Sequence, residues 1–310
     1  MDTLPPNGSW RMSVLPAMSD AQFARWAALL EARTGMNLPP ERRSFLTTSL
    51  AIRMREIGCV DYQSYYDLVT AVPGGVVEWS VLVDRLTVHE TRFFRHLPSL
   101  RVVEEQFLNC APAPDGPLRV DAWSVGCATG EEAYTLAMVI DNVLAARGMD
   151  YYLSISATDI SLAALAAGRR AVYPRRRITE VPPAFLERYF TALGDERYQV
   201  CARLRERVCF THRNVMETQP GALGRMDVIF CQNVLIYFDA PRRARILDML
   251  AASLKPGGLL LLGPGEVLHW PHPDMELVRR EQALAYRRRM SRQHAADAGS
   301  LQAAIGGYTS

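Results

Sequence analysis

The sequence lacks the features that mark membrane, secreted and nucleic-acid-binding proteins. None of its apolar runs reaches the roughly 18 residues that a membrane-spanning helix needs. The N-terminal residues include Pro5, Pro6 and Asn7 and do not resemble a signal peptide. The formal net charge is +2, so nucleic-acid binding through bulk charge is not expected. We therefore expect a cytoplasmic protein that does not insert into membranes.

Patterns typical of metal and disulfide sites are absent as well. The six histidines show no metal-ligand spacing, and the sequence contains no C-x-x-C motif. The six cysteines are scattered along the chain, at positions 59, 110, 127, 201, 209 and 231. This distribution argues against a zinc site and against a disulfide scaffold, so we expect reduced thiols and no bound metal.

The composition is that of a globular protein, with 49% hydrophobic and 22% charged residues. A chain of 310 residues is long enough for two domains with cores of their own. Apolar residues recur at helical spacing from Ser19 to about Leu86, which predicts an N-terminal helical domain over residues 18–96. Residues 1–17 and 290–310 are rich in small residues or proline and are expected to be flexible.

Four helices are predicted in the N-terminal domain. Asp20 is a candidate N-cap for the first, Gly35 ends it, and Pro39-Pro40 starts the second. The third covers residues 61–70 and the fourth residues 76–86. The second helix displays four arginines, which either form a basic face for an acidic partner or are simply solvated: Arg42, Arg43, Arg53 and Arg55.

Strands and helices alternate after a proline-rich connector at residues 111–117, which is typical of a doubly wound α/β domain. We assign residues 97–289 to this domain, with an inserted subdomain at about residues 172–207, where the alternation is interrupted. The predicted strands are Leu118–Ser124, Tyr152–Asp159, Val208–Thr211, Met226–Cys231, Gly258–Gly263 and a final edge strand, Ala283–Arg287. The predicted helices are Leu97–Cys110, Glu131–Ala146, Ser161–Gly168, Pro183–Tyr189 and Pro241–Ser253.

A turn with two glycines, Gly126 and Gly130, joins the first of these strands to its helix. Glycines let a ligand approach the backbone closely, although tight packing is the alternative explanation. The spacing is G-x-x-x-G, unlike that of dinucleotide binders, and two carboxylates follow it, Glu131 and Glu132. They would repel a pyrophosphate but not a sulfonium-bearing nucleoside such as S-adenosylmethionine. The turn also lacks the lysine of a P-loop, so ATP hydrolysis is not expected.

Polar side chains follow the next strands. Asp159 ends the second strand, where nucleotide-binding α/β folds place an acid that accepts hydrogen bonds from ribose hydroxyls. Capping of the next helix is the alternative role. Asn214 follows the third strand, and Gln232-Asn233 follows the fourth. Amides suit the donor and acceptor edge of adenine, whereas turn formation is their ordinary role. Together these residues favour a nucleoside pocket.

The segment Leu86–Arg95 is crowded with polar groups around Phe93 and Phe94. We expect the aromatic rings to anchor the segment in a core and to leave Thr91 and Arg95 available to a ligand. Arginine offers a bidentate fork for a carboxylate. A solvated charge run is the alternative. A lone histidine such as His89 is more often a hydrogen-bonding group than a general base.

Together these blocks resemble the CheR-type chemotaxis receptor methyltransferases, from about Ser19 to Arg289. The similar blocks are L-T-V-H-E-T-R-F-F-R (86–95), W-S-V-G-C-A-T-G-E-E-A-Y (123–134), C-Q-N-V-L-I-Y-F (231–238) and L-K-P-G-G (254–258). The resemblance implies methyl transfer from S-adenosylmethionine to glutamate side chains in the helical signalling domain of a chemoreceptor. It also implies an N-terminal helical domain, a Rossmann-like domain and a small inserted β-subdomain.

The resemblance implies site residues as well. Arg95 and Tyr237 are implied near the transferred methyl group. Three departures from the family pattern stand out: His89 replaces asparagine, Gln232 replaces arginine, and Gly263-Pro264-Gly265-Glu266 replaces G-H-S-E. No acid or glycine of the pocket is lost, so we expect cofactor binding to survive. The expected cofactor contacts are His89, Thr91, Arg95, Gly126, Gly130, Glu131, Asp159, Asn214, Val215, Gln232 and Asn233.

The expected partner is the cytoplasmic signalling domain of a methyl-accepting chemoreceptor, whose acidic helices Arg53 and Arg55 would steer. The segment 194–200 is short and lacks the glycine-rich sequence of members that tether to a receptor's C-terminal peptide, so we predict an enzyme that does not use such a tether. We also expect a monomer. Two alternatives stay open. One is a non-catalytic adaptor that keeps the pocket, and the other is an NAD-dependent oxidoreductase, which G-x-x-x-G-E-E disfavours.

Overall fold

The computed structural model describes residues 17–87, 89–267 and 270–290. These residues divide into two compact units, one made of residues 17–33 and 37–87, the other of residues 34–36, 89–267 and 270–290. The sequence-based boundary at residue 96 differs, because Phe93 and Phe94 are buried in the core of the second unit. The predicted flexible ends lie outside the described residues, apart from residues 17 and 290. No helix in the described ranges is long and apolar enough to span a membrane.

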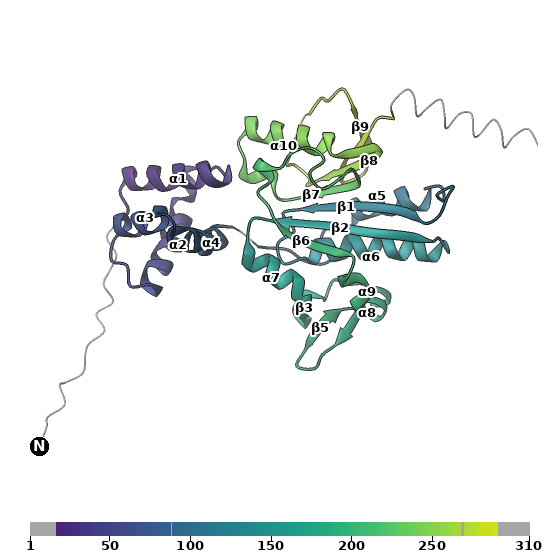
Figure 1. The fold of residues 1–310 in the computed structure, drawn as a ribbon, viewed down its shortest axis with the longest axis horizontal. Coiled ribbons are helices and arrows are strands. Elements are labelled where there is room, and N and C mark those ends of the chain that lie inside the picture. The colour runs from purple at the N-terminus through teal and green to yellow at the C-terminus, as the bar shows by residue number, and fades with distance from the viewer. Residues whose placement is uncertain (1–16, 88, 268–269, 291–310) are drawn as a thin grey trace, which may run out of the picture. The chain divides into compact units, whose positions relative to one another are not determined.

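The first unit is helical, as predicted (Figure 1). The carboxylate of Asp61 accepts hydrogen bonds from the backbone N–H groups of Gln63 and Ser64, both at 2.9 Å, and so begins the third helix. The second helix buries Leu46, Leu50 and Met54 along one face. The unit contains α1 (Asp20–Thr34), the 3-10 turn η1 (Pro40–Arg42), α2 (Arg43–Glu56), α3 (Tyr62–Thr70) and α4 (Gly75–Leu86).

The second unit is built on a seven-stranded sheet in the order β6-β2-β1-β7-β8-β10-β9 (Figure 1). The five strands from β6 to β8 are parallel, and β10 pairs antiparallel with both β8 and β9. The strands are β1 (Leu118–Val125), β2 (Tyr151–Asp159), β6 (Val208–His212), β7 (Met226–Cys231), β8 (Leu254–Leu262), β9 (Met275–Arg280) and β10 (Ala283–Arg288).

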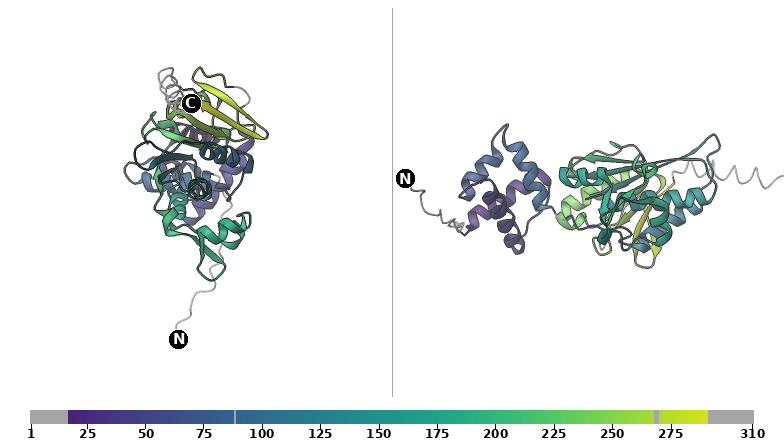
Figure 2. Two further views of the ribbon diagram at one scale, coloured as in Figure 1. Left: turned by 90° about the vertical axis from the view of Figure 1, so that its right-hand side faces the viewer. Right: turned by 90° about the horizontal axis from the view of Figure 1, so that it is seen from below.

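Helices lie around this sheet (Figure 2). The residues of β1 from Ala122 to Val125 are all buried, as expected for a central parallel strand with both faces covered. The chain leaves β1 toward β2 on one side and returns to β7 on the other, so a ligand crevice is expected at the carboxyl ends of these strands. The helical elements are α5 (Leu97–Leu108), α6 (Glu131–Ala146), α7 (Leu162–Arg170), η3 (Val215–Glu217), η4 (Leu235–Tyr237) and α10 (Ala240–Ala252).

The predicted strand Ala283–Arg287 exists as β10, but it is not the edge strand. It lies between β8 and β9, and β9 forms the edge. Strand β9 was not predicted because three of its six residues, M-E-L-V-R-R, are charged, so its apolar pattern is weak. Strand β8 also begins earlier than predicted, because Leu254 pairs with Met226 before an irregularity in the ladder.

The predicted inserted subdomain is confirmed as a separate three-stranded antiparallel sheet, in the order β3-β5-β4. Asp141 of α6 is fully buried and holds it in place, because the carboxylate accepts hydrogen bonds from Arg203 at 2.7 Å and Arg207 at 2.6 Å. The hydroxyls of Tyr151 and Tyr189 donate to the same carboxylate at 2.6 and 2.9 Å. The elements are β3 (Val172–Pro174), η2 (Arg175–Arg177), α8 (Pro183–Tyr189), β4 (Phe190–Ala192), β5 (Arg197–Val200) and α9 (Ala202–Arg205).

Candidate functional site

The glycine turn between β1 and α6 needs both of its glycines. Gly126 and Gly130 have φ values of 67° and 95°, in the left-handed region that favours glycine. A Cβ atom at Gly130 would lie 2.9 Å from the ring of Phe210, so tight packing explains this position. A Cβ atom at Gly126 would lie 2.5 Å from Val234, yet Gly126 is exposed. Its backbone is therefore the part of the turn that a ligand can approach.

Asp159 lies at the end of β2 and is tied to this turn. Its carboxylate accepts hydrogen bonds from the N–H groups of Ala128 at 2.9 Å and Ser161 at 2.8 Å. The hydroxyl of Ser161 caps α7 by accepting from Ala164, so Asp159 is not needed for that role. Burial raises the pKa of Asp159, and the nearby charge of His89 lowers it. The structure thus brings Asp159 and His89, both predicted site residues, together beside the glycine turn.

The two acids that follow the turn have different surroundings. Glu131 is buried and accepts a hydrogen bond from Thr129 at 2.6 Å, and its carboxylate lies 3.3 Å from the guanidinium of Arg177. The carboxyl of Glu132 accepts from Ser124 at 2.7 Å, its one hydrogen-bond partner within the described chain. Burial raises the pKa of Glu132 to about 8, although the positive charge of Arg95 opposes this. The negative charge of Glu132, which was not among the predicted site residues, is therefore less well balanced by its surroundings than that of Glu131.

A second acid missed by the sequence analysis, Glu266, lies near Glu132. It accepts hydrogen bonds from the N–H groups of Gly263 at 2.7 Å and Leu235 at 3.0 Å. Burial raises the pKa of Glu266, and its negative charge raises that of Glu132. Leu235 begins η4, which ends at Tyr237. Glu266 thus holds the turn that carries Tyr237 close to the acid that Arg95 faces.

The segment before α5 is anchored by its two aromatic rings, as predicted. Phe93 packs edge-on against Tyr173 and Phe190, with ring centroids 4.9 and 5.3 Å apart. Phe94 has a φ value of 53° and is buried as well. Arg95 is exposed, and its guanidinium donates to the carbonyl of Glu90 at 2.8 Å.

Three of the predicted contacts are partly engaged elsewhere. The amide of Gln232 is buried and donates to Ser99 at 2.9 Å and to the carbonyl of Leu262 at 3.0 Å. The side chain of Asn214 accepts from the N–H of Met216 and so caps η3, which begins at Val215. The carbonyl of Thr91 accepts from Arg177 at 2.8 Å. These three residues therefore have structural roles that the sequence did not reveal, in addition to any contact with a cofactor.

Asn233 differs from these three. It has a φ value of 60° at the end of β7, and its side chain has no hydrogen-bond partner among the described residues. A left-handed conformation at a non-glycine residue is uncommon and often marks a functional site. Of the predicted amides, Asn233 is therefore the one most available to a ligand.

The predicted basic face on α2 is only partly available. Arg53 donates to both carboxylate oxygens of Glu78, at 2.8 and 2.7 Å, and to Glu56 at 3.1 Å. Arg43 forms an ion pair with Asp20. Arg42 lies over the ring of Phe45, 5.1 Å from its centroid. Arg55 is exposed and forms no ion pair or aromatic contact with the described residues. Arg55 is thus the member of the set best able to meet an acidic partner.

These residues fit S-adenosylmethionine better than a metal ion. The carboxyl ends of β1, β2 and β7 offer exposed backbone at Gly126, acids at Glu132 and Asp159, and a spare amide at Asn233. Acids suit the hydroxyls and positive charges of this molecule, and an amide suits its base. Within the residues described, no group of acids, histidines and cysteines is arranged to hold a metal.

Comparison with known proteins agrees with this geometry. A family model described as the CheR methyltransferase SAM-binding domain matches residues 89–283, and one described as the CheR methyltransferase all-alpha domain matches residues 21–87. The chain is 32% identical to the chemotaxis protein methyltransferase of Klebsiella aerogenes, over 80% of this chain and 84% of that protein. It is 30% identical to chemotaxis protein methyltransferase 1 of Pseudomonas aeruginosa, over 87% and 98%. The chain therefore belongs to the CheR methyltransferase family and is an S-adenosylmethionine-dependent methyltransferase.

Proposed function

We propose that this methyltransferase transfers a methyl group to glutamate carboxylates in the signalling domain of methyl-accepting chemoreceptors, in the cytoplasm. The observation that supports this most directly is the setting of Glu132, which follows the glycine turn, accepts a hydrogen bond from Ser124 and feels the positive charge of Arg95. A half-buried acid with a single hydrogen-bond donor is suited to a cationic methyl donor, and an exposed arginine is suited to a carboxylate acceptor. An NAD-dependent oxidoreductase would need neither group, and family membership sets that alternative aside.

The donor supplies a methyl group bonded to a positively charged sulfonium. A glutamate side chain has an ordinary pKa of about 4.3, so the acceptor is already an anionic nucleophile at neutral pH and needs no general base. In our proposal Arg95 binds one oxygen of this carboxylate, and the hydroxyl of Tyr237 orients it while the other oxygen attacks. The rate then comes from alignment and exclusion of water.

Cofactor binding is assigned by position. We propose that Asp159 accepts from the ribose hydroxyls and that Asn233 binds the base. Glu132 takes the cationic end, replacing Glu131, which is engaged with Thr129 and Arg177. The remaining proposed contacts are His89, Thr91, Gly126, Gly130, Asn214, Val215 and Gln232. All of these come from one chain, so one copy carries a complete site.

We further propose that the enzyme finds its receptor without a C-terminal tether. The β4–β5 connection is a short turn, with Gly194, Asp195 and Glu196 all at positive φ. A turn of this size leaves little surface for an extended peptide. If a peptide copying a receptor tail bound with micromolar affinity, this part of the proposal would be wrong.

The direct test uses S-adenosylmethionine with a labelled methyl group and a receptor signalling fragment. We expect label in the receptor fragment and its release as methanol by alkali, because carboxyl methyl esters are alkali-labile. The variants Tyr237→Phe and Arg95→Ala should each lower kcat at least tenfold while cofactor binding persists. A non-catalytic adaptor would bind the cofactor and transfer no label, and wild-type kcat in both variants would contradict the assigned roles.

A further inference from the structure

The two edges of the seven-stranded sheet are protected differently. At the β6 edge, the guanidinium of Arg169 donates to the carbonyl of Phe210 at 2.6 Å and so occupies a backbone acceptor of the strand. At the β9 edge, most side chains are exposed, and Leu277 keeps 52% of its surface in contact with solvent. Open edges pair readily with another chain, and proteins usually block them. The exposed edge of β9 therefore needs an explanation.

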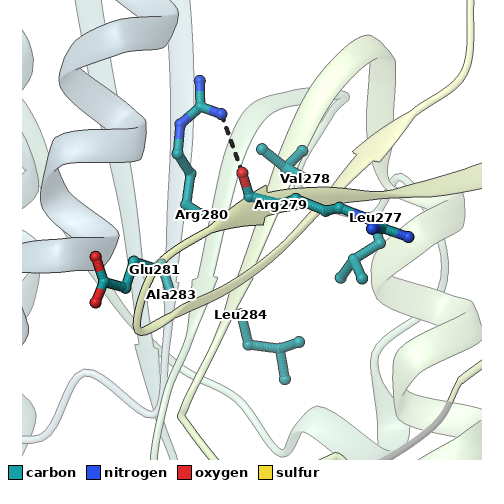
Figure 3. A pocket seen from close by; sticks show the side chains of 7 residues that line it. All are labelled: Leu277, Val278, Arg279, Arg280, Glu281, Ala283 and Leu284. Carbon is teal, nitrogen blue, oxygen red and sulfur yellow. Dashed lines mark hydrogen bonds between the residues drawn. The ribbon is translucent and has the colours of Figure 1, made fainter.

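The β9–β10 hairpin is hollowed beside this edge. A cavity of about 520 Å³ is lined by residues 277–281 together with Ala283 and Leu284. Figure 3 shows Val278 and Arg280 on one side of the hairpin and Leu284 on the opposite side. Among the described residues, the one side-chain hydrogen bond to the backbone of β9 is exposed: Arg280 donates to the carbonyl of Arg279 at 3.0 Å. A strand that adds to β9 can displace it at little cost.

The sequence of β9, M-E-L-V-R-R, is complementary to itself. When two copies pair antiparallel about Val278, Glu276 of each copy lies opposite Arg280 of the other. Residues two positions before and after the centre project from the same face of a strand, so both pairs form on one face. Opposite charges at directly opposed positions stabilise a strand pair.

The charged side chains are available for these contacts. Glu276 is exposed and has no ion-pair partner in the described residues. Arg280 contacts Glu105 at 2.8 Å, but the two side chains keep 52% and 46% of their surface exposed. Exposed pairs of this kind contribute little, so the guanidinium can be shared with a second carboxylate.

We propose that β9 is a dimerisation surface on which a second copy of this chain adds its own β9, antiparallel and centred on Val278. The interface is isologous, as expected for a two-fold dimer. It is small, so the dimer is weak and depends on protein concentration. The proposal replaces the monomer expected from the sequence, because that expectation did not include β9. Each catalytic site is complete in one chain, so methyl transfer does not depend on the dimer.

Sedimentation velocity of the full chain over a wide range of concentrations tests this. We expect wild-type protein to form a dimer, and Glu276→Arg and Arg280→Glu each to raise its dissociation constant about tenfold or more, because two pairs become repulsive. An equimolar mixture of the two variants should dimerise again, since both cross-strand pairs are then attractive. The double variant should behave as wild type does, within about threefold.

Arg176→Glu, an exposed charge reversal on the inserted subdomain, is the matched control and should leave the dimer unchanged. Glu276→Arg is the decisive single variant, because it removes no side-chain hydrogen bond or ion pair within the described chain. Cofactor binding by calorimetry checks that each variant is folded. A wild-type protein that stays monomeric at the highest concentration would overturn the proposal. So would a dimer that the single changes do not weaken, or a mixture that does not recover.

Discussion

Helix α6 carries two acids in contrasting surroundings, the half-buried Glu132 at its start and the fully buried Asp141 further along. Asp141 is held by two close arginines and two tyrosine hydroxyls under the inserted subdomain. Glu132, at the carboxyl ends of the strands, has one hydroxyl and the charge of Arg95. A buried charge is stable only when it is paired, so the first acid is complete as it stands. The second acid has room for a positive ligand, and in our proposal this difference separates a structural acid from a cofactor-binding acid.

The largest effect should follow from replacing Asp141, the acid whose charge is fully paired. Asp141→Ala leaves two arginines and two hydroxyls without their acceptor, and we expect a loss of about 3 kcal/mol in the free energy of unfolding. Thermal and denaturant unfolding measure it, with Asp141→Asn as a milder control that keeps an acceptor. Affinity for S-adenosylmethionine should stay within about threefold. If that affinity fell in step with stability, the two acids would not have separate roles.

The next largest effect should come from replacing Glu132, the acid whose charge is not fully paired. Glu132→Gln removes the carboxyl whose ionised form would face the cationic donor, and at pH 8 we expect affinity for S-adenosylmethionine to fall about tenfold to a hundredfold. Calorimetric titration measures this. Glu131→Gln is the matched control on the neighbouring residue and should change affinity less than about threefold. Equal losses in both variants would contradict the distinction between them.

A pH series sharpens the same comparison. Because the pKa of Glu132 is raised to about 8, its carboxyl is largely neutral in the free enzyme at pH 7. Affinity for the cationic donor should therefore rise as pH increases toward 8, and Glu132→Gln should flatten this rise. Asp159 and Glu266 also have raised pKa values, so the difference between variant and wild type isolates Glu132.

The contribution of Glu132 to the free energy of unfolding should fall as pH rises, whereas the affinity for the cofactor should increase. A carboxyl whose pKa is raised in the folded state contributes stability below its unfolded pKa, and this contribution is lost as pH rises through the folded value. Glu132→Gln should therefore gain stability relative to wild type between about pH 4.5 and pH 8. Urea unfolding at several pH values measures the difference, and a constant difference would mean that Glu132 ionises normally.

The smallest effect concerns the arginines of α2. Arg55→Ala should raise KM for a receptor fragment about twofold to fivefold and leave kcat unchanged. The KM of the wild-type enzyme should rise with salt, because salt screens the attraction between Arg55 and an acidic receptor. Arg53→Ala should instead lower stability by about 1–2 kcal/mol, because Arg53 pairs with Glu78. Steady-state kinetics at two salt concentrations, combined with unfolding, separates them. A salt-independent KM would count against receptor docking through this helix.

Much of the fold was predictable because strong local patterns agree with it. The predicted helices Glu131–Ala146 and Pro183–Tyr189 match α6 and α8 in their bounds, and the predicted strand Met226–Cys231 matches β7. Strand β9 was not predictable from its apolar pattern, since an exposed edge strand does not need one.

The candidate site was predictable as a location but not in detail. The glycine turn, Asp159 and Asn233 were selected because residues at strand ends converge in this class of sheet. The choice between Glu131 and Glu132 was not accessible, because neighbouring side chains on a helix point about 100° apart and only the tertiary structure orients them. The engagement of Gln232 with Ser99 was hidden for a related reason, since the two residues are far apart in the sequence.

The inserted sheet offers a place to change how the enzyme is directed to its target. Residues 191–197, from β4 through the hairpin tip into β5, are exposed, whereas the base of the subdomain is fixed through Asp141. Insertions at exposed tips of well-anchored hairpins are tolerated far better than changes in a core. A peptide-binding loop grafted between Leu193 and Arg197 can therefore direct the enzyme to a chosen target protein, while the proposed catalytic residues stay as they are.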